Sequence, residues 1–241
     1  MFEEIALTGG RITQGVVRRG DHVLRPCCPN AAFAHAVLRW LEGKGVDAAP
    51  RYIGLAEDGR EITSFLEGVA PGDLGHFDDA QLAKAGSIMK ELHAALADFP
   101  GCLAGQTVCH NDLSPCNFMF RDGLPYAVFD WDAAGIGDPL GDLAYAAWMW
   151  CDIGNPDNSA ADVGRMIKIM LDSYGLREES RSLLIAKIHE QIRRVETSMS
   201  DFLTASQQHE KRAAFRQWTG ACDRWLYEHQ DQIVPYFAPA L

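Results

Sequence analysis

The sequence predicts an α+β fold in which a small β-rich lobe, residues 1–67, precedes a larger and mostly helical lobe, residues 68–241. Short apolar stretches interrupted by glycine fill the first part, which is typical of antiparallel strands. Apolar residues at spacings of three and four dominate the second part, which is typical of amphipathic helices. The loop between them, residues 67–75, is rich in glycine and proline and therefore marks the boundary.

In the first lobe we expect an antiparallel meander over residues 1–26, because short apolar runs alternate there with glycines. Asn30 is suited to cap a helix after the meander. That helix would carry four apolar residues on one face: Phe33, Val37, Leu38 and Leu41. Two further strands are predicted at residues 52–55 and 61–66.

The second lobe begins with a helix that Asp78 or Asp79 can cap. Its apolar stripe consists of Leu82, Ala85, Met89, Leu92 and Leu96. The pair Asp138-Pro139 resembles an N-cap followed by proline at the first helical position, so another helix should run to about residue 150. Three more helices are expected near 158–174, 178–205 and 208–230.

Residues 110–117 and the later Asp130 carry the most informative pattern, which reads H-x-D-x-x-x-x-N and then D. In kinase-type chemistry one Asp accepts the proton of the substrate hydroxyl, while an Asn five residues later and a separate Asp hold metal ions on the nucleotide phosphates. Asp112, Asn117 and Asp130 match those three roles. The pattern therefore indicates a metal-assisted phosphoryl-transfer site.

A predicted β-hairpin makes this arrangement geometrically reasonable. Residues 118–120 and 126–129 form its strands, and residues 121–125 form its turn. Asn117 precedes the first strand and Asp130 follows the second, so the two should be near cross-strand neighbours. Their oxygens would suit Mg²⁺, which takes few protein ligands. The alternative is that these residues are ordinary turn and cap formers.

Composition narrows the class of protein. The formal net charge of −11 argues against a nucleic-acid-binding surface, which needs a basic face. Seven scattered cysteines form no disulfide or CxxC framework and suggest reduced thiols. The acidic N-terminus lacks a signal peptide, and no apolar run is long enough to span a bilayer. We therefore expect a cytoplasmic protein without a membrane partner.

Residues 110–117 and 128–144 resemble the aminoglycoside phosphotransferase and choline kinase-like family, which has a bilobal protein kinase-like fold. The second segment looks like the metal-binding strand and the following helix start of that family. The resemblance implies ATP, with GTP as the alternative, and Mg²⁺ as cofactors. It also implies that Asp112 is the catalytic base, that Asn117 and Asp130 bind the metal, and that His110 is a structural residue shaping the catalytic loop.

The first lobe departs from the family pattern at two positions. Where a lysine usually faces the nucleotide phosphates, this chain has Arg25, which can bind phosphate but differs from lysine in reach and shape. Where the next helix usually carries a glutamate, this chain has His35. An exposed strand end remains an equal alternative for Arg25, and an ordinary surface or boundary position is favoured for His35.

Two other segments complete the expected nucleotide site. Gly9 and Gly10 lie in a loop that could cover the phosphates, although a plain hairpin turn fits equally well. Phe65 and Leu66 would belong to the hinge between the lobes, whose backbone contacts adenine in relatives.

These residues predict an ATP-dependent kinase that phosphorylates a hydroxyl of a small molecule, such as an aminoglycoside-, choline- or sugar-like alcohol. The acceptor could be cationic, because acidic and aromatic residues are frequent in the last third, and no obligate protein partner is evident. A pseudokinase that binds nucleotide without transfer is one alternative. A phosphatase of the haloacid dehalogenase type, using Asp130 and Asp132 on a parallel sheet, is another.

Overall fold

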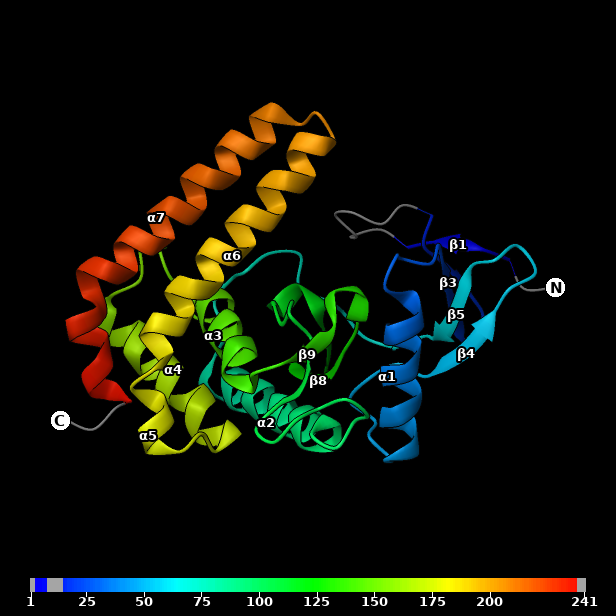
Figure 1. Cartoon of the computed structure of the whole chain (residues 1–241), viewed down its shortest axis with the longest axis horizontal. Helices are drawn as coiled ribbons and strands as arrows, with labels where there is room; N and C mark the ends of the chain where they lie inside the picture. Colours follow the sequence, from blue (N-terminus) through cyan, green and yellow to red (C-terminus); the bar gives the residue numbers. More distant parts are fainter. Residues whose placement is uncertain (1–2, 8–14, 238–241) are drawn as a thin grey trace. The chain divides into compact units, whose positions relative to one another are not determined.

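A computed structural model of the chain describes residues 3–7 and 15–237 (Figure 1). The chain forms two compact units. Unit 1 consists of Met1–Asp73 and Ile88–Pro139, and unit 2 of Leu74–Ser87 and Leu140–Leu241. The boundary between lobes at residues 67 and 68 stays a prediction.

Unit 1 contains a five-stranded antiparallel sheet in the order β1-β2-β3-β5-β4. Its strands are β1 (Ile5–Ala6), β2 (Val17–Arg19), β3 (His22–Arg25), β4 (Tyr52–Leu55) and β5 (Glu61–Ser64). The register of β3 and β5 places Arg25 directly opposite Glu61. Helix α1 (Ala31–Gly43) follows β3 and buries Val37, Leu38 and Leu41, as its apolar spacing predicts.

Two short sheets position the motif residues. Strand β6 (Thr107–Cys109) pairs with β9 (Gly135–Gly137), and β7 (Phe118–Arg121) forms the predicted hairpin with β8 (Leu124–Val128). The turn is tighter than predicted, because Asp122 and Gly123 both adopt positive φ angles of 51° and 80°, which suits a two-residue hairpin. Pro125 therefore lies in β8 and not in the turn.

Every strand pairing among the residues that the structure describes is antiparallel. The haloacid dehalogenase alternative requires its aspartate pair on a parallel sheet. That interpretation of Asp130 and Asp132 is therefore wrong.

Helix α2 (Asp79–Leu96) belongs to both units and begins at a reciprocal cap. The backbone amide of Gln81 donates to Asp78 Oδ1 at 2.8 Å, and the amide of Asp78 donates to Gln81 Oε1 at 2.9 Å. This arrangement satisfies two of the amides left free at the start of a helix, so Asp78 is the residue that caps α2.

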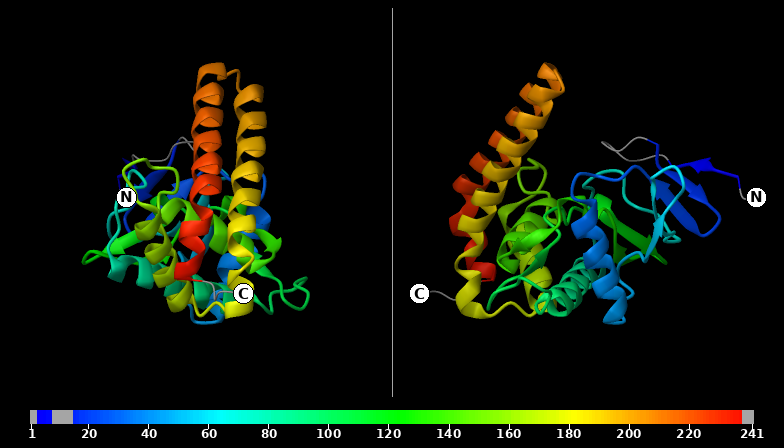
Figure 2. Two further views of the ribbon diagram at one scale, coloured as in Figure 1. Left: turned by 90° about the vertical axis from the view of Figure 1, so that its left-hand side faces the viewer. Right: turned by 45° about the vertical axis from the view of Figure 1, so that its right-hand side comes forward.

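Unit 2 also contains six helices that follow the hairpin in the chain, the first of which begins one residue before the unit: α3 (Pro139–Trp150), α4 (Ala160–Tyr174), α5 (Glu178–Arg181), α6 (Leu184–Ala205), α7 (His209–Ile233) and the short 3-10 helix η3 (Val234–Tyr236). Helices α6 and α7 lie side by side along their length (Figure 2). Trp148 is fully buried and stacks on Trp218 with ring centroids 5.1 Å apart. The aromatic residues of α3 thus build core, which was the favoured interpretation of their helical spacing.

Within the described ranges, no helix is both long and apolar enough to cross a membrane.

Candidate functional site

His110 is buried at the end of β6, where it fixes the start of the motif loop. Its Nε2 lies 3.0 Å from the carbonyl oxygen of Phe129, and its Nδ1 lies 3.3 Å from the backbone amide of Asp112. A carbonyl only accepts and an amide only donates, so Nε2 carries the hydrogen and Nδ1 offers a lone pair. Trp131 meets the imidazole edge-to-face at 4.8 Å. His110 therefore connects Asp112 to the end of the hairpin, consistent with a shaping role.

Asn111 provides a second connection within this region. Its φ angle is +64°, a left-handed conformation that Asn tolerates better than most residues. The side-chain amide donates to the carbonyl oxygen of Ala133 at 2.9 Å. The loop before Asp112 is thereby attached to the segment that follows Asp130.

Asn117 lies at the mouth of the hairpin, and its amide has a defined orientation. Its side-chain Nδ2 donates to the carbonyl oxygen of Asp112 at 2.9 Å. Its backbone carbonyl oxygen accepts from the amide of Phe129 at 3.0 Å. The amide nitrogen is occupied by this bond, so Oδ1 is the atom available to a ligand. Because Phe129 directly precedes Asp130, the hairpin brings the two predicted metal ligands to neighbouring positions.

Asp130 ends the hairpin with a φ angle of +66° and precedes the short 3-10 helix η2 (Trp131–Ala133). Its side chain does not cap η2. Instead, Asp130 Oδ1 accepts from Arg25 Nη1 at 2.8 Å, and Asp132 accepts from Arg25 Nη2. The carboxylates of Asp130 and Asp132 thus converge on one guanidinium, at the place where the sequence predicts a metal.

Arg25 is bound by three carboxylates and is not an exposed strand-end residue. Besides Asp130 and Asp132, its Nε donates to Glu61. Burial alone would lower the pKa of Arg25, but the charges of Asp132, Glu61 and Asp130 outweigh it and raise that pKa above its ordinary value. The side chain is 17% exposed and stays positively charged.

Glu61 is the site residue that the sequence reasoning missed. It is 2% exposed, and its two oxygens contact different partners: Oε1 accepts from Arg25 Nε, and Oε2 contacts His35 Nε2. His35 is itself buried, at 8% exposure, so it is not the surface or boundary residue that the sequence favoured. Its ring stacks on Tyr52 with centroids 3.9 Å apart. The glutamate partner of Arg25 therefore comes from strand β5, and helix α1 contributes a histidine.

Asp132 and Asn30 attach helix α1 to the loop after the hairpin. The Asn30 amide donates to the carbonyl oxygens of Asp132 at 3.1 Å and Ala134 at 2.9 Å, and it makes no cap bond to α1. Asn30 is thus the N-cap residue of α1, as expected, but its side chain bonds the loop after the hairpin and not the helix amides. Burial raises the pKa of the Asp132 carboxyl, and Arg25 opposes that rise. Burial also raises the pKa of the neighbouring Cys28 thiol to about 11.

Four other residues are predicted to contact a nucleotide. Gly9 and Gly10 lie outside the described residues. The backbone amide of Phe65 donates to the carbonyl of Asp21 at 2.8 Å, and Arg18 lies over its ring at 3.8 Å. Leu66 is half-buried next to it. The roles of these four residues toward a nucleotide stay predictions.

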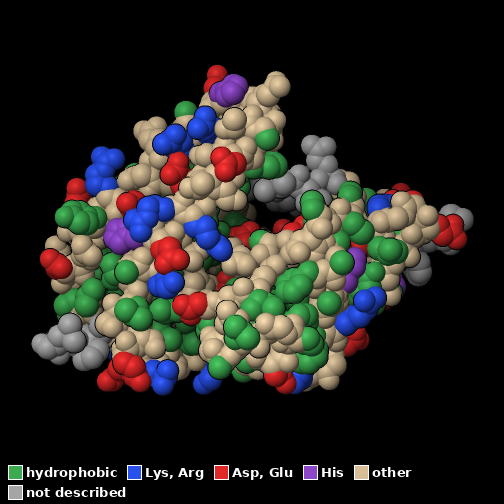
Figure 3. Space-filling view, in the orientation of Figure 1, with side chains coloured by type: hydrophobic (Ala, Val, Ile, Leu, Met, Phe, Trp, Pro, Cys, Tyr) green, Lys and Arg blue, Asp and Glu red, His purple; other side chains and the backbone are tan. Residues whose placement is uncertain are grey.

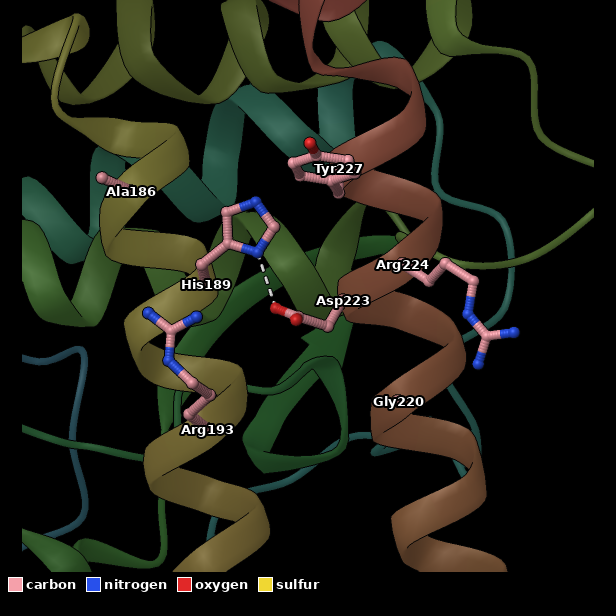
Figure 4. Close-up of a pocket in the computed structure, with 7 residues that line it drawn as sticks. All are labelled: Ala186, His189, Arg193, Gly220, Asp223, Arg224 and Tyr227. Carbon is pink, nitrogen blue, oxygen red and sulfur yellow. Dashed lines mark hydrogen bonds and ion pairs between the residues drawn. The ribbon is translucent and has the colours of Figure 1, made fainter.

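A separate pocket of about 560 Å³ opens between helices α6 and α7 of unit 2 (Figure 4). It is lined by Ala186, His189, Arg193, Gly220, Asp223, Arg224 and Tyr227. His189 Nδ1 and Asp223 Oδ1 lie 2.6 Å apart across it, whereas Arg224 points away from this pair. Basic and acidic side chains are mixed over these helices on the face shown in Figure 3. None of the predicted site residues lines this pocket.

Comparisons with known proteins agree on the family. A family model described as "Phosphotransferase enzyme family" matches residues 102–166, which include the whole motif. The trifolitoxin immunity protein of Rhizobium leguminosarum bv. trifolii is 32% identical over 214 residues, covering 78% of this chain and 80% of its own.

Solved structures match the fold over most of the chain. A choline/ethanolamine kinase family protein from Mesorhizobium loti has a TM-score of 0.65 at 18% identity, covering 92% of this chain and 88% of its own. The GDP complex of wild-type aminoglycoside 2′-phosphotransferase-IIIa has a TM-score of 0.66 at 14% identity, covering 93% of both chains. The amicoumacin kinase hAmiN, in complex with AMP-PNP, Ca²⁺ and Ami, has a TM-score of 0.63 at 11% identity, covering 85% and 84%.

The fold prediction is confirmed by these structural matches, and the predicted family is confirmed by the family model together with the curated relative. The chain belongs to the phosphotransferase enzyme family and has a protein kinase-like fold, the fold that it shares with these solved structures.

Proposed function

We propose that the protein transfers the γ-phosphoryl group of ATP to a hydroxyl group of a small molecule. The observation that carries this proposal is the fixed placement of Asp112, Asn117 and Asp130 around one hairpin mouth in unit 1. The Asn117 side chain donates to the backbone carbonyl of Asp112, and the His110 ring bonds the Asp112 amide. Both residues also bond the backbone of Phe129, which directly precedes Asp130. Phosphoryl transfer relies mainly on positioning and charge stabilisation, and this arrangement supplies both.

In this proposal Asp112 is the catalytic residue. Its carboxylate accepts the proton of the acceptor hydroxyl as the oxygen forms a bond to the γ-phosphorus. The bond between the γ-phosphorus and the bridging oxygen then breaks, and ADP leaves with the electron pair. The His110 and Asn117 hydrogen bonds hold the backbone of Asp112 on both sides, so the carboxylate needs little reorganisation.

The donor set near Asp130 fits Mg²⁺. Asn117 offers Oδ1, and Asp130 and Asp132 offer carboxylate oxygens, which are the hard ligands this ion prefers. When bound, Mg²⁺ would neutralise the phosphate oxygens during transfer. Arg25 pairs with the carboxylates of both Asp130 and Asp132. A bound metal ion would replace the guanidinium at these carboxylates, and the guanidinium could then bind a phosphate of the nucleotide. GTP remains an alternative donor.

Replacing Asp112 with Asn tests the proposal. The matched control is Asp122→Asn, an equivalent change at an exposed turn residue of the hairpin. ATP or GTP consumption would be measured with Mg²⁺ and a panel of choline, ethanolamine, sugars and aminoglycosides. We expect Asp112→Asn to lower turnover about 10²–10⁴-fold while nucleotide affinity persists, since it removes only the base. Equal turnover by Asp112→Asn and Asp122→Asn would contradict the assignment.

Immunity to a toxic compound is a second candidate function, because the relative that is 32% identical is a trifolitoxin immunity protein. Phosphorylation of the compound and binding without transfer, as in a pseudokinase, would both protect a cell. Trifolitoxin-sensitive bacteria producing the wild type or Asp112→Asn separate the two. Protection by the wild type alone indicates transfer, and protection by both indicates binding. Protection by neither removes trifolitoxin as the target.

A further inference from the structure

Three side chains with metal-binding atoms converge beside Arg25, outside the predicted Mg²⁺ ligands. Cys27 Sγ, an imidazole nitrogen of His35 and a carboxylate oxygen of Glu61 all lie within 4.8 Å of one another. They come from three separate elements: the segment after β3, helix α1 and strand β5. A tetrahedral metal ion with ligand distances of about 2.0–2.3 Å would reach all three after small side-chain adjustments.

We propose that Cys27, His35 and Glu61 bind one transition-metal ion of the zinc class. Sulfur, imidazole nitrogen and carboxylate oxygen are the ligands that Zn²⁺ takes in proteins. Three protein ligands leave a fourth position for water or another group. A thiolate ligand also separates this site from the oxygen-only set near Asp130, because Mg²⁺ does not favour sulfur.

The two buried ligands are already oriented. His35 is held by stacking on Tyr52, and Arg39 in turn lies over the Tyr52 ring at 4.5 Å. Glu61 Oε1 accepts a hydrogen bond from Arg25 Nε, and Glu61 Oε2 contacts His35 Nε2. A metal ion would replace the hydrogen shared by His35 and Glu61, while Arg25 keeps its bond to the other oxygen. Such hydrogen bonds to a ligating carboxylate are typical of protein metal sites.

The third ligand gives access from solvent. Cys27 is exposed, and its Sγ lies 3.5 Å from the carbonyl oxygen of Gly59 in the turn between β4 and β5. His35 and Glu61 lie behind it at 8% and 2% exposure. An ion can therefore enter at the thiol and reach two ligands shielded from water. Bound there, it would link β3, α1 and β5 next to Arg25.

Titration of the full-length chain with Co²⁺ tests this site without measuring phosphotransfer. Cobalt accepts the same ligands, and its bond to a thiolate gives a charge-transfer absorption band. Cys27→Ser and His35→Gln each remove a ligand, while Cys28→Ser removes the adjacent thiol, which lies outside the cluster. Circular dichroism checks the fold of each variant. Because Cys27 is exposed, Cys27→Ser should fold even if the buried His35→Gln does not.

We expect the wild type and Cys28→Ser to bind one Co²⁺ with the thiolate band, and Zn²⁺ but not excess Mg²⁺ to displace it. Cys27→Ser should lose the band, and His35→Gln should bind at least about tenfold more weakly. Absence of the band in the wild type, its persistence in Cys27→Ser, or its loss in Cys28→Ser would overturn the site. Unchanged affinity in folded His35→Gln would do the same. None of these outcomes affects the proposed phosphotransfer.

Discussion

Two regions of unit 1 are held together in different ways: the motif loop, which is residues 110–117, and the Arg25 cluster, which is Arg25, Glu61, Asp130 and Asp132. In the motif loop, neutral hydrogen bonds to backbone groups fix His110, Asn111 and Asn117. In the Arg25 cluster, charged side chains from β3, β5 and the loop after β8 bind one another. The first region is therefore held by uncharged hydrogen-bonding groups, whereas the second depends on complementary charges.

This difference predicts how each region responds to substitution. Removing one partner from a buried charge cluster leaves another charge unpaired, which is strongly destabilising. Removing one neutral hydrogen bond exposes a smaller desolvation penalty. We therefore expect the largest losses in the Arg25 cluster, intermediate losses in the motif loop and the smallest at exposed ion pairs.

Replacement of Glu61 with Gln should have the largest effect on stability. The free energy of unfolding should fall by about 3 kcal/mol, the low end for a broken buried pair, because Arg25 keeps Asp130 and Asp132 as partners and some exposure. Urea denaturation measures it. Glu67→Gln is the matched control, since Glu67 pairs with Arg18 at 65% exposure and should change stability by less than about 1 kcal/mol. Equal losses of stability in the two variants would show that the buried Glu61 pair stabilises the fold no more than the exposed Glu67 pair.

Replacement of His110 with Phe should have an intermediate effect. The ring can still pack on Trp131, but the Phe129 carbonyl and the Asp112 amide lose their partner, at a cost of about 1–3 kcal/mol. Denaturant unfolding measures the loss. His110→Gln restores a donor and should recover part of it. If the His110→Phe variant is as stable as the wild type, the hydrogen bonds of His110 to Phe129 and Asp112 do not hold the motif loop in place.

Two substitutions at Asn111 separate backbone strain from its side-chain hydrogen bond. Both Asn111→Ala and Asn111→Gly remove the bond to Ala133, but only Gly adopts a φ angle of +64° without strain. We expect Asn111→Ala to be less stable than Asn111→Gly by about 1 kcal/mol in thermal unfolding. Equal stabilities would indicate that the loop relaxes out of the left-handed conformation.

The smallest effect is expected at Glu4, an exposed counterpart of Glu61. Hydrogen bonds from Arg60 and Arg19 lower the pKa of Glu4 to about 2 from its ordinary value of 4.5. A carboxyl whose pKa is lower in the folded state than in the unfolded state stabilises the fold when the pH is above its unfolded-state pKa. This contribution disappears as the pH falls through the folded-state pKa of about 2. Unfolding of the wild type and Glu4→Gln between pH 6 and 2 should therefore converge. A gap that widens toward low pH would contradict the shift.

The motif loop could be predicted from the sequence because its residues lie close together in the chain. Spacing alone indicated Asp112 and Asn117, and the hairpin pattern placed Asp130 near them. Glu61 was missed because its importance arises only when β3 and β5 pair in register opposite Arg25. Asn30 occupies the predicted N-cap position of α1, but its side chain bonds the distant carbonyls of Asp132 and Ala134, which local sequence could not show.

The two hydrogen bonds of Asn30 have a mechanical consequence. They attach the first turn of α1 to the loop that carries Asp130 and Asp132, while His35 attaches the next turn to β5. Helix α1 is thus bonded to neighbouring segments at two successive turns, and a rotation of the helix would have to break these bonds or move the loop with it. We therefore expect a displacement of α1 to shift the loop that carries the carboxylates of Asp130 and Asp132.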